Sequence, residues 1–115
     1  MELAEWSRRV AAIVRDLGDR RYQQRSWLGR DPGKVSSPGE MCCTLCDDLD
    51  FGELLNAPGL GWNAAQRAAA LDLLAAIGAC AVADDVLPPA EVLDHPDWVR
   101  VRASAKRLDS LLHNR

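Results

Sequence analysis

Apolar side chains that recur at intervals of three and four residues, the period of one helix face, constrain this chain more than any other feature of its sequence. One such run near the N-terminus consists of Leu3, Trp6, Val10, Ile13 and Leu17. A second run, after Pro96, consists of Trp98, Val101, Ala105, Leu108 and Leu112. Residues that favour strands are scarce, with one Tyr, one Phe and two Ile, whereas Ala and Leu are abundant. The sequence therefore predicts an all-α fold.

Capping residues mark where several helices begin. Asp19, after Gly18, predicts that the helix over residues 3–17 continues as a second one over residues 19–28. The segment Ser37-Pro38-Gly39-Glu40 has the spacing of a capping box, which predicts a helix that reaches Asp47-Asp48. Asp50 and Glu53 have the same spacing, so we expect Asp50 to cap a short helix in the same way.

Asn63 and Gln66 predict the start of a helix over residues 64–83, which we expect to be the longest and most buried one. Its expected apolar stripe is Leu71, Leu74, Ile77, Gly78 and Ala81, with Leu73 and Val82 beside it. Asp84 and Asp85 would lie near the negative end of its dipole, where acidic side chains are disfavoured. Either this helix ends sooner or the two charges serve something outside it.

These segments fit one domain over residues 1–115, a compact helical bundle of four main helices plus two or three short ones. A composition of 48% hydrophobic residues is enough to fill the core of such a domain. No stretch approaches the roughly 20 uncharged apolar residues that a membrane span requires, and the N-terminus lacks an apolar signal core. We therefore expect a cytoplasmic protein that does not associate with membranes.

The net charge of −3 hides an acidic middle between two basic ends. Residues 1–39 carry a net charge of +3, residues 40–97 carry −10 with Arg67 as their single base, and residues 98–115 carry +4. Such an asymmetry is typical of an interaction surface. We expect a basic partner to bind the acidic residues Asp47, Asp48, Asp50, Glu53, Asp84 and Asp85.

The four cysteines include the pair Cys43 and Cys46 in a C-x-x-C spacing. A zinc site usually needs a second closely spaced pair, and the other possible ligands, Cys80, His95 and His113, are scattered. A redox pair would follow a strand and lie near a helix N-terminus, which this pair does not. We therefore interpret Cys42, Cys46 and Cys80 as small buried hydrophobic residues and expect neither metal nor cofactor, although a metal or redox role stays a third possibility.

Motifs for catalysis are missing. Neither His95 nor His113 has a serine or cysteine motif around it, and the sequence contains no phosphate-binding glycine loop. We therefore expect a protein that is not an enzyme.

The basic ends carry a second hypothesis, direct nucleic-acid binding. Their cationic residues are Arg8, Arg9, Arg15, Arg20, Arg21 and Arg25 in the first segment and Arg100, Arg102, Lys106 and Arg107 in the last. Guanidinium groups suit phosphate well. However, a pI near 5.3 is low for a nucleic-acid-binding domain, and the acidic middle would repel a phosphate backbone on the same face.

Four short motifs resemble those of a known group of proteins. They are Tyr22-Gln23-Gln24-Arg25-Ser26-Trp27-Leu28-Gly29, Val35-Ser36-Ser37-Pro38-Gly39-Glu40-Met41, Leu45-Cys46-Asp47-Asp48 and Pro96-Asp97-Trp98. Through them the chain resembles, over about residues 5–110, the small bacterial immunity proteins encoded beside contact-dependent growth inhibition toxins. The resemblance implies a protein that binds one toxin domain, delivered from a neighbouring cell, and blocks it stoichiometrically.

Such toxins are frequently nucleases that attack tRNA or DNA, and a nuclease has a basic substrate cleft. A small protein with an acidic face can occupy or overlie that cleft in place of phosphates. The expected function is therefore an immunity protein that neutralises a cognate toxin domain by binding at or near its active site. The alternative is a small nucleic-acid-associated regulator that uses its arginine-rich terminal helices.

Overall fold

The computed structural model describes residues 1–29, 36–82 and 86–113, and every regular element in these three ranges is a helix. In chain order the elements are α1 (Leu3–Leu17), α2 (Arg20–Trp27), α3 (Pro38–Cys43), the π-helix η1 (Thr44–Asp48), α4 (Phe51–Leu54), α5 (Ala64–Ala79), α6 (Pro89–Val92) and α7 (Pro96–His113). Because η1 continues α3 without a break, these two form one bent helix. The predicted all-α bundle is confirmed.

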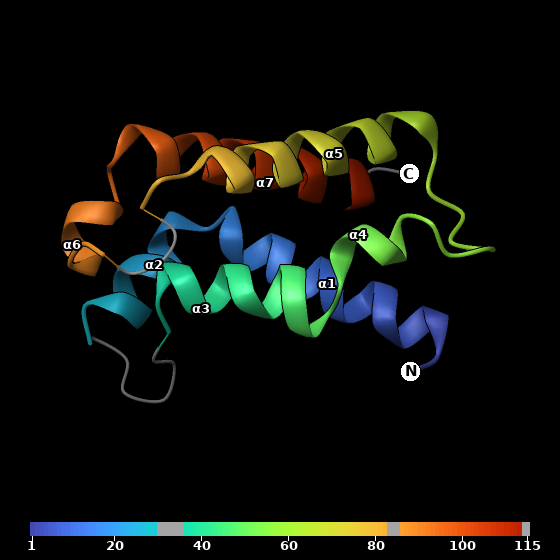
Figure 1. The fold of residues 1–115 in the computed structure, drawn as a ribbon, viewed down its shortest axis with the longest axis horizontal. Coiled ribbons are helices and arrows are strands. Elements are labelled where there is room, and N and C mark those ends of the chain that lie inside the picture. The colour runs from blue at the N-terminus through green and yellow to red at the C-terminus, as the bar shows by residue number, and fades with distance from the viewer. Residues whose placement is uncertain (30–35, 83–85, 114–115) are drawn as a thin grey trace.

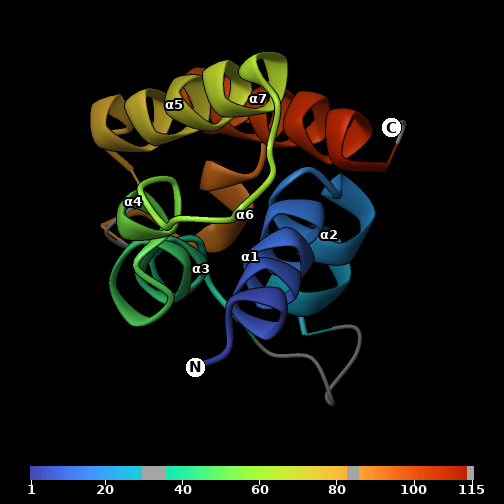
Figure 2. The same ribbon diagram turned by 90° about the vertical axis from the view of Figure 1, so that its right-hand side faces the viewer.

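The long helices form two layers (Figure 1). Helices α5 and α7 lie antiparallel in one layer, and α1 lies beside the α3–η1 helix in the other. The short helices α2 and α6 close one end of the bundle, while the start of α1 and the end of α7 lie toward the opposite end. Figure 2 shows the α5–α7 layer across the top of α1 and α4.

Helix α7 is the central element of the core. All five members of its predicted stripe, from Trp98 to Leu112, are buried. Trp98 has no exposed surface, and its ring lies 5.3 Å from that of Trp27 between centroids. Helix α7 packs most extensively against α5 and α1. The periodicity of this segment therefore identified a core helix correctly.

Three of the four predicted N-caps are present. The Asp19 carboxylate accepts a hydrogen bond from the Tyr22 amide, the Ser37 hydroxyl accepts one from Glu40, and Asn63 forms a reciprocal capping box with Gln66. The prediction for Asp50 is wrong: this residue precedes α4, but its side chain makes no cap hydrogen bond. Its backbone is left-handed, with φ of 46°, which turns the side chain away from the amides of the next turn.

The helix predicted over residues 64–83 ends at Ala79, and Cys80 is extended. With 16 residues it is shorter than the 18-residue α7, so it is not the longest helix. The expected stripe is only partly correct. Leu73 and Val82 are buried, and Leu74 and Ile77 pack half-buried against the core, but Leu71 is 59% exposed, and Gly78 and Ala81 are exposed as well. The buried face of α5 consists of Gln66, Ala69, Ala70, Leu73 and Ala76. Alanine on several sides leaves the pattern ambiguous, and packing selects the face with small residues, which lets α7 approach closely.

Candidate interaction surfaces

Four acidic residues from the predicted partner site lie together at the junction of η1 and α4. Asp47 and Asp48 end η1, Asp50 follows it, and Glu53 is in the first turn of α4. All four are exposed. We call these four residues the acidic surface.

The backbone around Asp50 explains how these side chains come to face the solvent. The Leu49 amide donates to the Thr44 carbonyl at 2.9 Å, which is a hydrogen bond with the five-residue separation of a π-helix. Leu49 is buried, and its carbonyl accepts a hydrogen bond from the Trp6 indole nitrogen of α1. Phe51 is fully buried on the other side of Asp50. These anchors on both sides hold the acidic surface against the N-terminal half of α1.

No base neutralises the acidic surface within the ranges that the structure describes, since none of its members forms an ion pair there. Arg67, the single base of residues 40–97, is bound elsewhere. Its Nε donates to the Trp62 carbonyl at 3.2 Å, and its Nη1 donates to the Leu55 carbonyl. Asp47 and Asp48 also lie at the C-terminal end of a helix, where its dipole disfavours negative charge. The acidic surface therefore carries charge that serves no visible purpose inside the fold.

Asp84 and Asp85, the other two predicted partner-binding residues, lie outside the described residues. Helix α5 ends at Ala79, so the first of the two predicted alternatives, an earlier end of this helix, is the one that the structure shows.

The arginine-rich ends of the chain meet across a groove of about 620 Å³. Its cationic side chains are Arg15 of α1, Arg20 and Arg21 of α2, and Arg102 and Lys106 of α7. We call it the basic groove. A neighbouring hollow shares Arg15 and also contains Arg8, Tyr22 and Arg25. Arg107 lies apart from both and pairs with Asp72, with 3.5 Å between Nη1 and Oδ2.

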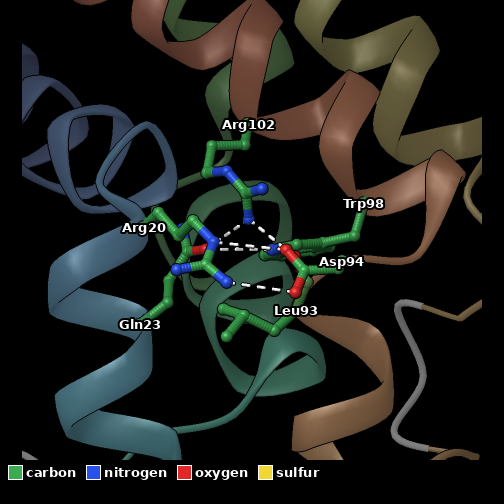
Figure 3. A network of polar contacts seen from close by, with 6 residues as sticks. All are labelled: Arg20, Gln23, Leu93, Asp94, Trp98 and Arg102. Carbon is green, nitrogen blue, oxygen red and sulfur yellow. Dashed lines mark hydrogen bonds and ion pairs between the residues drawn. The ribbon is translucent and has the colours of Figure 1, made fainter.

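A polar network fixes the inner wall of the basic groove (Figure 3). Gln23 of α2 has no exposed surface, and its Oε1 accepts hydrogen bonds from Trp98 Nε1 at 3.1 Å and from Arg102 Nη1 at 3.3 Å. Its Nε2 donates to the carbonyls of Asp16 and Leu17 at 3.0 and 2.8 Å. One buried amide therefore joins the end of α1 to α2 and α7.

Two arginines of the groove are held by this wall. Arg102 Nη1 also donates to the Leu93 carbonyl at 2.8 Å. Arg20 forms a two-bond pair with Asp94, at 3.2 and 3.0 Å. The hydrogen bond from Arg20 lowers the pKa of Asp94, and burial, followed by repulsion from Arg20, lowers the pKa of Arg102. The guanidinium of Arg102 is thus held by hydrogen bonds between one neighbouring cation, Arg20, and one neighbouring carboxylate, Asp94.

All four cysteines line a third hollow, between α3–η1 and the end of α5. Cys42 and Cys80 are buried as predicted, but Cys46 is only half-buried because η1 adds residues to its turn. The four thiols are free, and the described part of the chain contains no cluster of three His, Cys, Asp or Glu side chains that could hold a metal ion. Burial, and then Asp47 and Cys43, raise the pKa of Cys46.

Both histidines contact groups other than a nucleophile. His95 Nδ1 accepts a hydrogen bond from the Asp97 amide at the start of α7, and His113 Nε2 lies 3.0 Å from Asp109 Oδ1. Among the described helices none is long and apolar enough to cross a bilayer. Comparisons of the chain with protein-family models, curated proteins and solved structures give no match.

Proposed function

We propose that this chain is a cytoplasmic immunity protein, without catalytic activity, that binds and neutralises a cognate contact-dependent growth inhibition toxin domain. The observation that carries the proposal is the acidic surface, with four exposed carboxylates and no ion pair in the described structure. The motifs shared with immunity proteins support the same role.

A basic nuclease domain is the partner that this charge suits. Opposed potentials accelerate encounter and favour one orientation of the two proteins. The acidic surface is attached rigidly through buried Leu49 and Phe51. Its backbone therefore loses little conformational entropy when a partner binds. Four carboxylates held this way offer a nuclease cleft a substitute for substrate phosphates.

The partner for the test is the C-terminal domain of the large secreted protein expected beside this gene. Cells that produce this toxin domain should survive when they also produce the chain, and the two purified proteins should form an equimolar complex. The test variant combines Asp47→Lys, Asp48→Lys and Asp50→Asn, because asparagine tolerates the left-handed backbone at position 50. We expect it to lose protection and complex formation while it stays folded.

A matched control places the same change of charge elsewhere, with Glu40→Lys, Glu91→Lys and Asp72→Asn, all at exposed positions. We expect this control to protect cells as the parent does. If the test variant stays folded and protects equally well, the acidic surface is not the binding site. If long nonspecific DNA or RNA binds the chain tightly and steeply loses affinity with salt, the regulator alternative replaces the inhibitor function.

A further inference from the structure

The basic groove contains more positive charge than its own carboxylates balance. Its lining has five cationic residues and two acidic ones, Asp19, which caps α2, and Asp109, whose buried Oδ1 lies 3.0 Å from His113 Nε2 without forming a hydrogen bond. Asp94 pairs with Arg20 alone. The side chains of Arg15, Arg21 and Lys106 form no ion pair or hydrogen bond within the described ranges, and all three residues are exposed. A surplus of cationic side chains from three helices therefore converges on one concave surface.

Gly18 creates this convergence. A Cβ atom at this position would lie 3.0 Å from both the Cα and the amide nitrogen of Lys106, which is tighter than most Cβ contacts in proteins. The glycine thus lets the corner between α1 and α2 rest on the backbone of α7. This contact sets Lys106 beside the first turn of α2, where Arg20 and Arg21 project.

The inner cations of the groove are ordered before any ligand arrives. Arg102 is held by Leu93 and Gln23, and Arg20 by its two bonds to Asp94. Side chains that are already ordered lose less conformational entropy on binding. The N-terminal end of α2 adds a partial positive charge at the same place.

The size and lining of the groove indicate the ligand class. A volume of about 620 Å³ is within the usual range for small-molecule sites. Guanidinium forks match the oxygen geometry of phosphate. Val99 and Ala103 add an apolar wall, and Val99 is 41% exposed. We propose that the basic groove between the α1–α2 corner and α7 is a binding site for a compact phosphate-bearing ligand of nucleotide size.

The test titrates the full chain with two probes, inorganic pyrophosphate and ATP without metal, by isothermal titration calorimetry at low salt. The groove variant is Arg21→Gln with Lys106→Gln, and the matched control is Arg8→Gln with Arg107→Gln, which removes two charges elsewhere. We expect both probes to bind the parent and the control with similar affinity. The groove variant should bind at least about tenfold more weakly, because it loses two side chains that can form charge-assisted hydrogen bonds to phosphate.

Thermal unfolding of both variants shows that they fold, since all four residues are exposed. Absence of binding to the parent, or an equal loss in the control, overturns the proposal. A fluorescent single-stranded oligonucleotide forms the last arm. If it binds, if pyrophosphate fails to displace it, and if Arg25→Gln in the neighbouring hollow weakens it, the site is a nucleic-acid track and the proposal is wrong. These outcomes are independent of the toxin-protection assay, which concerns other residues.

Discussion

Replacement of Gln23 by methionine should destabilise the protein by about 2–4 kcal/mol, because four hydrogen bonds meet at this one buried side chain. Methionine keeps most of the length and volume of the side chain but none of its polar atoms. Two of the lost partners, the Leu17 carbonyl and the Trp98 indole, are in fully buried bonds, so water cannot replace Gln23 there. Each orphaned group costs about 1–3 kcal/mol, and the added apolar burial offsets about 1 kcal/mol.

Urea unfolding, followed by circular dichroism and tryptophan fluorescence, measures this loss. Gln24→Met on the same helix is the matched control, because the side chain of Gln24 is half-buried and outside the network. We expect its free energy of unfolding to change by less than about 0.5 kcal/mol.

A double-mutant cycle isolates the contact between Gln23 and Trp98. Trp98→Phe removes the indole donor, so the double variant no longer contains a buried N–H without a partner. We expect the two effects to sum to about 1 kcal/mol more than the loss in the double variant. A loss in Gln23→Met no larger than in the control, or strict additivity in the cycle, refutes the assignment of Gln23 as the joint between α1, α2 and α7.

Three further predictions test other contacts. Gly18→Ala should destabilise by about 1–3 kcal/mol through its clash with the α7 backbone, whereas Gly78→Ala, with open space around it in α5, should stabilise by about 0.5–1 kcal/mol; equal signs in thermal unfolding would contradict this. Asp94 has a lowered pKa, so its contribution to stability is present above its unfolded pKa of about 3.9 and disappears as pH falls through the folded value; Asp94→Asn should be less stable than the parent at pH 6 and equal to it at pH 2 in urea titrations. Iodoacetamide at pH 8 should modify exposed Cys43 before half-buried Cys46, whose pKa is raised, and mass spectrometry showing the reverse order would contradict it.

The parts of this fold that could be predicted from sequence are those coded by neighbouring residues. The α7 stripe and the caps at Asp19, Ser37 and Asn63 each depend on positions within a few turns of one another. The acidic surface is of the same kind, because Asp47 and Glu53 are only six residues apart. The face of α5 could not be predicted, since alanine there is compatible with either a buried or an exposed position.

The basic groove and its wall depend on tertiary contacts that leave no local signal. Gln23, in a polar segment with Arg21 and Arg25 two residues away on either side, has the pattern of a surface residue, yet it is completely buried and bonded to α7. The sequence shows that Gly18 interrupts a helix. It does not show that the backbone of Lys106 packs against this glycine. The convergence of Arg15, Arg21 and Lys106 follows from that contact. It brings together residues that are about 90 positions apart in the sequence.

The two-signed charge pattern has a consequence that follows from the geometry of α1. The acidic surface is attached at Trp6, and the basic groove begins at Arg15, so about 14 Å of helix separates them at 1.5 Å per residue. This distance exceeds the screening length of about 8 Å at physiological ionic strength. Charge reversal at Asp47 and Asp48 should therefore leave phosphate binding in the groove unchanged, and neutralisation of Arg21 and Lys106 should leave protection by the acidic surface unchanged. A partner bound at one end leaves the other accessible, so loss of both functions in either variant would show that the two surfaces are not separate sites.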